Sequence, residues 1–218
     1  ATVIQPLGVG HALQVFRERW GLPDHRPVIG SLGRLTSGGV KGFDLLLGAA
    51  AHLRERVPNL EILVVGDGPR REFLEDETRR LSLDGRVHFV GVMDDVRIAL
   101  AVMDVFIFAS RWPEGFGLAL AEAMAAGRPI VATRAGAVNE LIEHGRSGWL
   151  VPPDDAAALA DGAARLLADH QAATALGQAG RERIRTHYSL ERVTDEVEAV
   201  YREVVGDEIR LRDVDRLP

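Results

Sequence analysis

A carboxylate follows a glycine-rich turn near the middle of the chain. Glu122 is the one charged residue of the predicted helix 118–126, and the turn 115–117 (Gly-Phe-Gly) precedes that helix. Helical side chains lean toward the N-terminus of their helix, so Glu122 should point back to the free N–H groups of the turn. A nucleotide carries complementary groups, since its phosphates accept from N–H groups and its ribose hydroxyls donate to a carboxylate. The pattern therefore favours a nucleotide site here.

The other residues of this helix predict the surroundings of Glu122. They are apolar on every face, and a helix of that kind is normally buried. A carboxylate is rarely buried without a partner, and no basic residue stands at helical spacing from Glu122. The alternative is a structural role, in which an arginine from a distant segment pairs with Glu122.

Two cations follow the first predicted strand. Arg34 follows the strand 28–32 after one glycine, and Lys41 precedes the predicted helix 43–56. Ligands of doubly wound sheets bind at the carboxyl ends of the strands, where both side chains would lie. Each charge-assisted contact to a phosphate contributes about 1.5–3 kcal/mol. Taken alone, the two cations are better explained as solvated surface residues.

Other strand ends carry weaker signals. The run 66–69 (Gly-Asp-Gly-Pro) resembles the start of a dinucleotide fingerprint, but Arg71 stands where the third glycine belongs, so a tight turn explains it better. Gly91 and Val92 follow a third strand, where backbone groups could meet a flat ring or simply form a turn. Glu114 precedes the 115–117 turn, and a carboxylate there could also stabilise the helix N-terminus by about 0.3–1 kcal/mol.

Strand-length apolar runs alternate with helix-length amphipathic stretches through the first two thirds of the chain. This alternation predicts an α/β fold, a Rossmann-like parallel sheet with helices on both faces. The predicted strands are 28–32, 60–65, 87–90, 105–109, 129–133 and 149–151. The predicted helices between them are 43–56, 70–83, 96–102 and 118–126, and three more follow at about 154–169, 171–186 and 189–205.

Composition limits the class of protein. The chain has 218 residues, 46% of them apolar, no cysteine and a net charge of −6. An acidic chain with mixed charges argues against nucleic-acid binding. Scattered histidines without ligand spacing predict no metal site. No apolar run approaches the ~20 residues of a membrane span, so we expect no membrane span in this chain and a cytoplasmic location.

The ordered motifs resemble the C-terminal half of a retaining GT-B glycosyltransferase of the large family 4, the glycogen-synthase and mannosyltransferase-like group. The strongest match is the pair Glu114 and Glu122, eight positions apart, around Gly-Phe-Gly and before Ala-Met. The resemblance runs from residue 3 to about 205 and includes the motifs at 33–35, 41–46, 64–69, 87–91, 132–133 and 145–151.

The resemblance implies roles for individual residues. Arg34 and Lys41 would bind the donor diphosphate, Glu114 would contact hydroxyls of the transferred sugar, and these three are the expected catalytic residues. Glu122 would bind the ribose hydroxyls. The other implied donor-binding residues are Gly91, Val92, Gly115, Phe116, Gly117 and Leu118. Since protein cations would neutralise the diphosphate, we expect no metal and no cofactor beyond the UDP- or GDP-linked sugar.

The resemblance also implies a domain plan. Residues 1–20 would connect to an N-terminal acceptor domain, 21–188 would form the nucleotide-sugar-binding domain, 189–205 would be a helix crossing back to the acceptor domain, and 206–218 a tail. We therefore expect an inactive half of a hexosyltransferase that binds its donor. The alternatives are a nucleotide-sugar epimerase, a non-catalytic nucleotide-binding module and a nicotinamide oxidoreductase.

Overall fold

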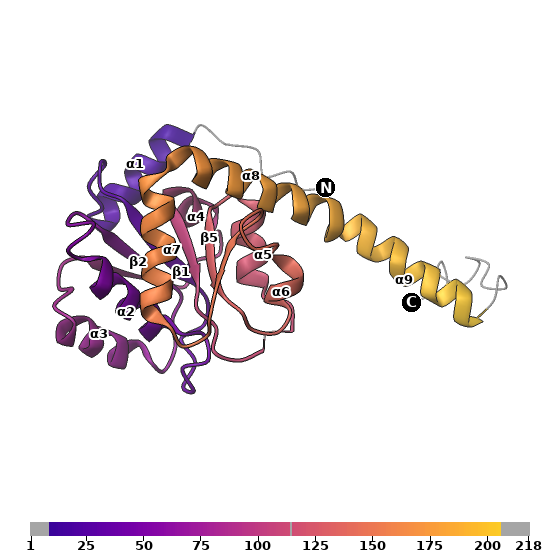
Figure 1. Ribbon diagram of the computed structural model, residues 1–218, viewed down its shortest axis with the longest axis horizontal. Helices are drawn as coiled ribbons and strands as arrows, with labels where there is room; N and C mark the ends of the chain where they lie inside the picture. Colours follow the sequence, from indigo (N-terminus) through magenta and orange to yellow (C-terminus); the bar gives the residue numbers. More distant parts are fainter. Residues whose placement is uncertain (1–8, 114, 206–218) are drawn as a thin grey trace, which may run out of the picture.

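The computed structural model describes residues 9–113 and 115–205, and a single parallel sheet organises them (Figure 1). The strand order is β3-β2-β1-β4-β5-β6, the order of dinucleotide-binding sheets, which confirms the predicted Rossmann-like α/β fold. The strands are β1 Val28–Leu32, β2 Glu61–Val65, β3 Val87–Gly91, β4 Val105–Phe108, β5 Ile130–Thr133 and β6 Trp149–Val151.

Nine helices are described in residues 9–113 and 115–205. They are α1 Val9–Trp20, α2 Phe43–Leu53, α3 Arg71–Arg80, α4 Arg97–Val102, α5 Leu118–Ala125, α6 Val138–Leu141, α7 Ala156–Ala168, α8 His170–His187 and α9 Leu190–Val205. The sequence missed α6, which is too short to show a helical period. The predicted helices 43–56 and 70–83 were too long, because their last residues form turns.

The central strands are buried on both faces. Val105 and Ile107 of β4 point into one apolar layer, which is shared with α2, α3 and α7. Phe106 and Phe108 of the same strand point into the other layer, shared with α1, α4, α5 and α6. Adjacent side chains of a strand face opposite sides of its sheet, so continuous apolar runs require cover on both. Figure 1 shows α7 crossing one face.

Small residues let α8 lie close to the end of α5. A Cβ added to Gly177 would come within 2.3 Å of the carbonyl oxygen of Gly127, which follows α5. Asp169 caps α8, since its carboxylate accepts from the N–H of Ala172 at 2.9 Å. Because the backbones meet without an intervening side chain, α8 holds the turn after α5 in place.

The first and last described helices differ in how they pack against the rest of the fold. On α1, Phe16 is buried in the layer that contains α4 and α5. Helix α9 instead extends away from the sheet (Figure 1). Its apolar side chains are exposed; they are Leu190, Val193, Val197, Val200, Tyr201 and Val204. The predicted domain boundaries at 20, 188 and 205 remain predictions.

Candidate functional site

The sheet topology brings the loops after β1 and β4 together. The two strands are neighbours. The strands that follow β1 in the chain, β2 and β3, lie on one side of this pair, and those that follow β4, β5 and β6, lie on the other side, which makes the pair the topological switch point. Arg34 and Lys41 lie in the connection that follows β1, and residues 115–117 lie in the connection that follows β4. The fold therefore places both predicted groups at the carboxyl edge of one strand pair.

Close backbone contacts join these two loops. The N–H of Arg111 donates to the carbonyl oxygen of Val40 at 2.9 Å. Gly42, which precedes α2, has a left-handed backbone with φ 63°. A Cβ added to Gly42 would lie 2.0 Å from the carbonyl oxygen of Ala109. Only glycine fits this conformation and this space, so the start of α2 is fixed against the end of β4.

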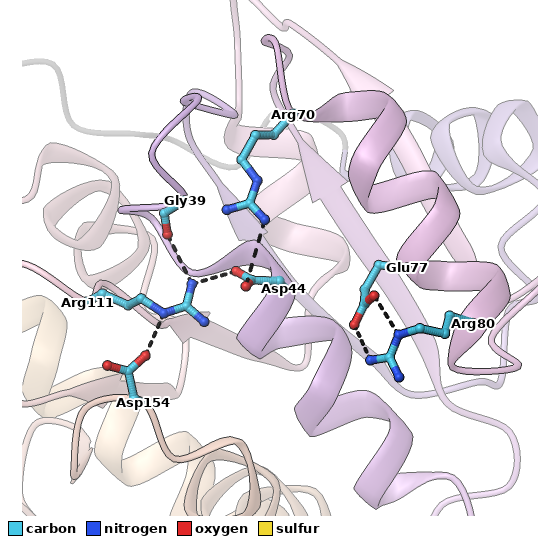
Figure 2. A network of polar contacts seen from close by, with 7 residues as sticks. All are labelled: Gly39, Asp44, Arg70, Glu77, Arg80, Arg111 and Asp154. Atoms are coloured by element: carbon cyan, nitrogen blue, oxygen red, sulfur yellow. Dashed lines mark hydrogen bonds and ion pairs between the residues drawn. The ribbon is translucent and has the colours of Figure 1, made fainter.

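Arg111 is the centre of an ionic network at this edge (Figure 2). Its guanidinium donates to Asp44 at 2.7 Å, to Asp154 at 2.5 Å and to the carbonyl oxygen of Gly39 at 3.1 Å. Arg70 adds an ion pair with Asp44 at 3.9 Å. The network joins the loop after β1, the first turn of α2 and the segment before α7.

The network also sets the charge state of Asp44. Burial acts to raise the pKa of this carboxyl, but the hydrogen bond and charge of Arg111, together with the charge of Arg70, outweigh it and hold the pKa below its ordinary value. No local sequence pattern indicates this network, because its ion pairs join residues that are 67 and 43 positions apart in the chain.

The two predicted cations differ in their surroundings. Arg34 is exposed, and its side chain has no hydrogen bond or ion pair with any residue of the described ranges. Lys41 is half-buried and lines a small hollow of about 10 Å³ together with Thr36, Gly39 and Arg70. Arg34 is thus available to a ligand at the carboxyl edge, and the Arg111 network holds the loop that carries Lys41.

Helix α5 begins directly after the glycine-rich turn, as the sequence predicted, and the glycine that precedes it is left-handed. Gly117 has φ 82°, and because it has no side chain it cannot cap the helix with a side-chain hydrogen bond. The first intrahelical bond runs from the N–H of Ala121 to the carbonyl oxygen of Gly117, at 3.0 Å. The N–H groups of residues 118–120 precede that bond and have no acceptor within the helix. A helix start of this kind attracts an anion.

The prediction that α5 is buried on every face is wrong. Leu120, Ala123 and Met124 are buried, but Leu118 is 72% exposed and Glu122 is exposed as well. One face of α5 packs on the sheet, and the other is exposed among residues 9–113 and 115–205. Leu118 and Glu122 lie four positions apart, so they share the open face.

Glu122 has no hydrogen bond or ion pair with any residue in the part of the chain that the structure describes. The alternative of a distant arginine partner therefore finds no support there. Partial burial among apolar neighbours raises the pKa of its carboxyl above the ordinary value. The environment of Glu122 disfavours its charge and supplies nothing to offset it, which is typical of a group that binds a ligand.

The remaining predicted site residues lie at the carboxyl edge of the sheet, except for one that lies outside the described residues. Gly91 is the last residue of β3, has φ 78° and accepts from the N–H of Gly66 at 2.7 Å. Val92 follows it and is 78% exposed. Gly115 and Phe116 are exposed, and the Phe116 ring contacts Tyr188, which the sequence did not single out. Glu114 lies outside the described residues.

The chain belongs to the glycosyl transferases group 1 family, whose model matches residues 26–169. A GDP-mannose-dependent alpha-(1-6)-phosphatidylinositol monomannoside mannosyltransferase of Mycolicibacterium smegmatis is 37% identical over 184 residues, 81% of this chain and 46% of that protein. The crystal structure of Anabaena Alr3699/HepE in complex with UDP and glucose aligns with a TM-score of 0.80 at 26% identity, over 88% of this chain and 52% of that one.

A third relative shows which half this is. The crystal structure of the C-terminal domain of a glycosyl transferase group 1 protein (LpcC) from Francisella tularensis aligns with a TM-score of 0.68 at 28% identity, over 82% of this chain and 98% of that one. The chain spans about half the length of the curated relatives it matches. The expected fold, the C-terminal half of a GT-B glycosyltransferase, is confirmed, and a transferase is favoured over the alternatives.

Two further observations concern only the described ranges, 9–113 and 115–205. They contain no group of three or more histidine, aspartate or glutamate residues that could hold a metal ion. Their helices include none with the length and apolar character needed to span a bilayer. The cytoplasmic location stays a prediction.

Proposed function

We propose that this chain is the donor-binding half of a retaining, family 4 hexosyltransferase and that its donor is a UDP- or GDP-linked sugar. The observation that carries the proposal is that the uncapped start of α5 and Arg34 lie at the same carboxyl edge of the sheet, at the switch point between β1 and β4. Two relatives support the choice of ligand: one was crystallised with UDP and glucose, and another is described as GDP-mannose-dependent.

Each residue has a role in this proposal. Arg34, Lys41 and the N–H groups at the start of α5 stabilise the diphosphate, and Glu122 accepts from the ribose hydroxyls. Glu114 contacts the transferred sugar beside the backbone of Gly115, Phe116, Gly117 and Leu118. Gly91 and Val92 lie against the base. No metal ion is part of the proposal, because these cations and amides already face the anionic charge.

Transfer would proceed at the anomeric carbon of the donor. The bond from C1 to the phosphate oxygen breaks, negative charge collects on the departing diphosphate, and an acceptor hydroxyl attacks C1 from the same face while its proton passes to the leaving group. Preorganised donors act on charge as it develops, so Arg34 and Lys41 would lower the barrier rather than merely tighten ground-state binding.

An upstream domain would hold the acceptor. The exposed apolar stripe of α9 supports this part of the proposal, since residues 190, 193, 197, 200 and 204 follow a spacing of three and four that forms one face of a helix. We assign that face to the upstream domain and expect this chain alone to bind the nucleotide with little or no sugar transfer.

Calorimetric titration with UDP, GDP and ADP tests the proposal. One of the three should bind, and Glu122→Ala should weaken it by about 1.5–3 kcal/mol, the size of a hydrogen bond to a charged group. Glu203→Ala is the matched control, because Glu203 is an exposed carboxylate on α9. Equal affinity in the Glu122 and Glu203 variants would remove Glu122 from the site. Sugar transfer by the unaccompanied chain, at a rate typical of complete enzymes, would remove the need for a second domain.

A further inference from the structure

A groove of about 530 Å³ lies at the opposite edge of the sheet from the proposed donor site. Residues that immediately precede strands line it, namely Pro27 before β1, Asp104 before β4 and Pro129 before β5. All strand pairs of the sheet are parallel. This edge therefore carries the amino ends of the strands. The length of the strands separates the groove from the carboxyl edge.

The charge of the groove is opposite to that of the chain. Four arginines and two histidines line it, and only two aspartates oppose them. With neutral histidines the lining has an excess of two positive charges, whereas the whole chain has a net charge of −6. A concave surface of one sign focuses the field and attracts the opposite charge. The cationic residues are Arg17, Arg26, Arg128, Arg181, His25 and His170.

Some of these charged side chains already have hydrogen-bond or ion-pair partners within the protein. Arg26 pairs with Glu61 at 2.7 Å, and Arg17 donates to the carbonyl oxygen of Pro23 at 2.9 Å. Asp104 accepts from the N–H of Val28 at 2.8 Å. Arg181 is exposed and has no hydrogen bond or ion pair with any residue from 9–113 or 115–205. Its guanidinium is therefore available to a ligand.

Arg128 is a half-buried cation of the groove whose charge is only partly compensated. Its Nη1 donates only to carbonyl oxygens, at 3.2 Å for Met103 and 3.4 Å for Ala101, and its Nε is buried with no partner. Burial lowers the pKa of Arg128, against the opposing charge of Asp104. A desolvated cation without an adequate counter-charge is costly. An anion beside Arg128 would offset that cost.

Part of the remaining wall is apolar and comes from two layers of the fold. Leu166 and Leu167 belong to the last turn of α7, Ala173 to the first turns of α8, and Ala126 follows α5. The volume lies within the range of about 300–1,000 Å³ that is typical of small-molecule sites. A ligand that matches the groove carries a doubly negative group on a compact, partly apolar body.

We infer that this groove is a second binding site, specific for a small phosphomonoester and separate from the proposed donor site. A phosphomonoester carries a charge of about −1.5 to −2 near neutral pH, and Arg181 and Arg128, neither of which forms an ion pair with a described residue, would supply two positive charges. Arg181 and Arg128 would hold the phosphate, and the leucines of α7 would contact the organic part. The inference does not depend on the proposed function, since no residue is shared between the two sites.

Amide-resolved NMR titration with glycerol 3-phosphate tests the inference, with a saturating nucleoside diphosphate present to fill the donor site. We expect shifts at the amides of residues 25–26, 126–128 and 170–174. Arg181→Gln should weaken binding about tenfold, as expected for the loss of a charge-assisted contact. Arg79→Gln is the control, because Arg79 is an exposed arginine on α3 outside the groove.

Both positions are exposed, so both variants should fold, and their melting temperatures check this. Shifts confined to the carboxyl edge, or equal affinity in the Arg181 and Arg79 variants, would overturn the inference. A parallel arm uses vesicles that contain phosphatidic acid. Binding to these vesicles without binding to glycerol 3-phosphate would also overturn it, because the partner would then be a lipid surface.

Discussion

The ring of Phe116 packs against the ring of Tyr188, with 5.7 Å between centroids and 57° between planes. Phe116 lies in the turn before α5, and Tyr188 lies where α8 ends and α9 begins. The hydroxyl of Tyr188 also donates to the carbonyl oxygen of Glu140 at 3.1 Å. The junction between α8 and the projecting helix α9 is therefore in direct contact with the turn to which we assign the donor phosphates.

Tyr188→Ala should weaken nucleotide binding although Tyr188 is not assigned to the ligand. An aromatic pair contributes about 0.5–1.5 kcal/mol beyond its buried area, and its loss would free the turn to leave its binding conformation. Tyr188→Phe keeps the ring and removes only the hydroxyl, so we expect its affinity to stay near that of the unchanged chain. Calorimetric titration measures both, and an alanine variant that binds as tightly as the phenylalanine variant contradicts the prediction.

Arg111→Gln should reduce the free energy of unfolding by about 1–3 kcal/mol, because it leaves the half-buried Asp44 without its main partner. Asp44→Asn should cost a similar amount. The double variant should cost less than the sum, since neither residue then leaves an unpaired charge. Asp154→Asn serves as the comparison, and its cost should be smaller because the Asp154 side chain is 62% exposed.

Urea denaturation of the four variants measures this coupling. Strict additivity of Arg111→Gln and Asp44→Asn would contradict the network as an energetic unit. Nucleotide affinity of Arg111→Gln gives a second measurement, since the network holds the loop that carries Arg34 and Lys41. We expect affinity to fall in this variant even under conditions where it remains fully folded.

Local sequence patterns were sufficient for the sheet and its main helices. Strands such as β4 consist of buried apolar residues, and Asp155 marks the start of α7 by accepting from the N–H of Ala158 at 2.8 Å. The same patterns placed Gly117 at the start of α5. These features depend on neighbours in the chain, so a single sequence contains them.

The surroundings of the site could not be predicted from local sequence patterns, because they depend on segments that are distant in the chain. The apolar composition of α5 predicted burial on every face, but Leu118 is 72% exposed. The partners of Arg111 come from three other segments, and the contact of Phe116 with Tyr188 joins two ends of the fold. Spacing rules along one helix or strand carry no information on such pairs.

The apolar stripe of α9 should contribute almost nothing to the stability of this chain. Val197→Lys changes a side chain that is 49% exposed on a helix that leaves the sheet, so the free energy of unfolding should change by no more than about 0.5 kcal/mol. Phe16→Lys is the contrasting control, because Phe16 is buried and lysine there requires a charge in the core. A loss of stability in the Val197 variant as large as in the Phe16 variant would mean that α9 packs within this chain.

Glu122→Gln should stabilise the free chain slightly and weaken its complex with nucleotide. The folded-state pKa of Glu122 is raised, so the folded chain holds this proton more tightly than the unfolded chain. Stability therefore falls as pH rises from the unfolded pKa through the folded pKa, and the full cost is present at about pH 7. Because Glu122 is partly solvated, we expect a gain of no more than about 0.5 kcal/mol in the variant.

The gain should depend on pH, and this dependence separates it from a general effect of the substitution. Denaturation at about pH 7 should show the variant as the more stable chain, and the difference should shrink as the pH falls below the unfolded pKa of glutamate, about 4.3. With saturating nucleotide the order should reverse, since a ribose hydroxyl then donates to the carboxylate of the unchanged chain. A variant that is less stable at about pH 7 without nucleotide would mean that Glu122 already has a favourable partner in the fold, and the case for a ligand at this position would fail.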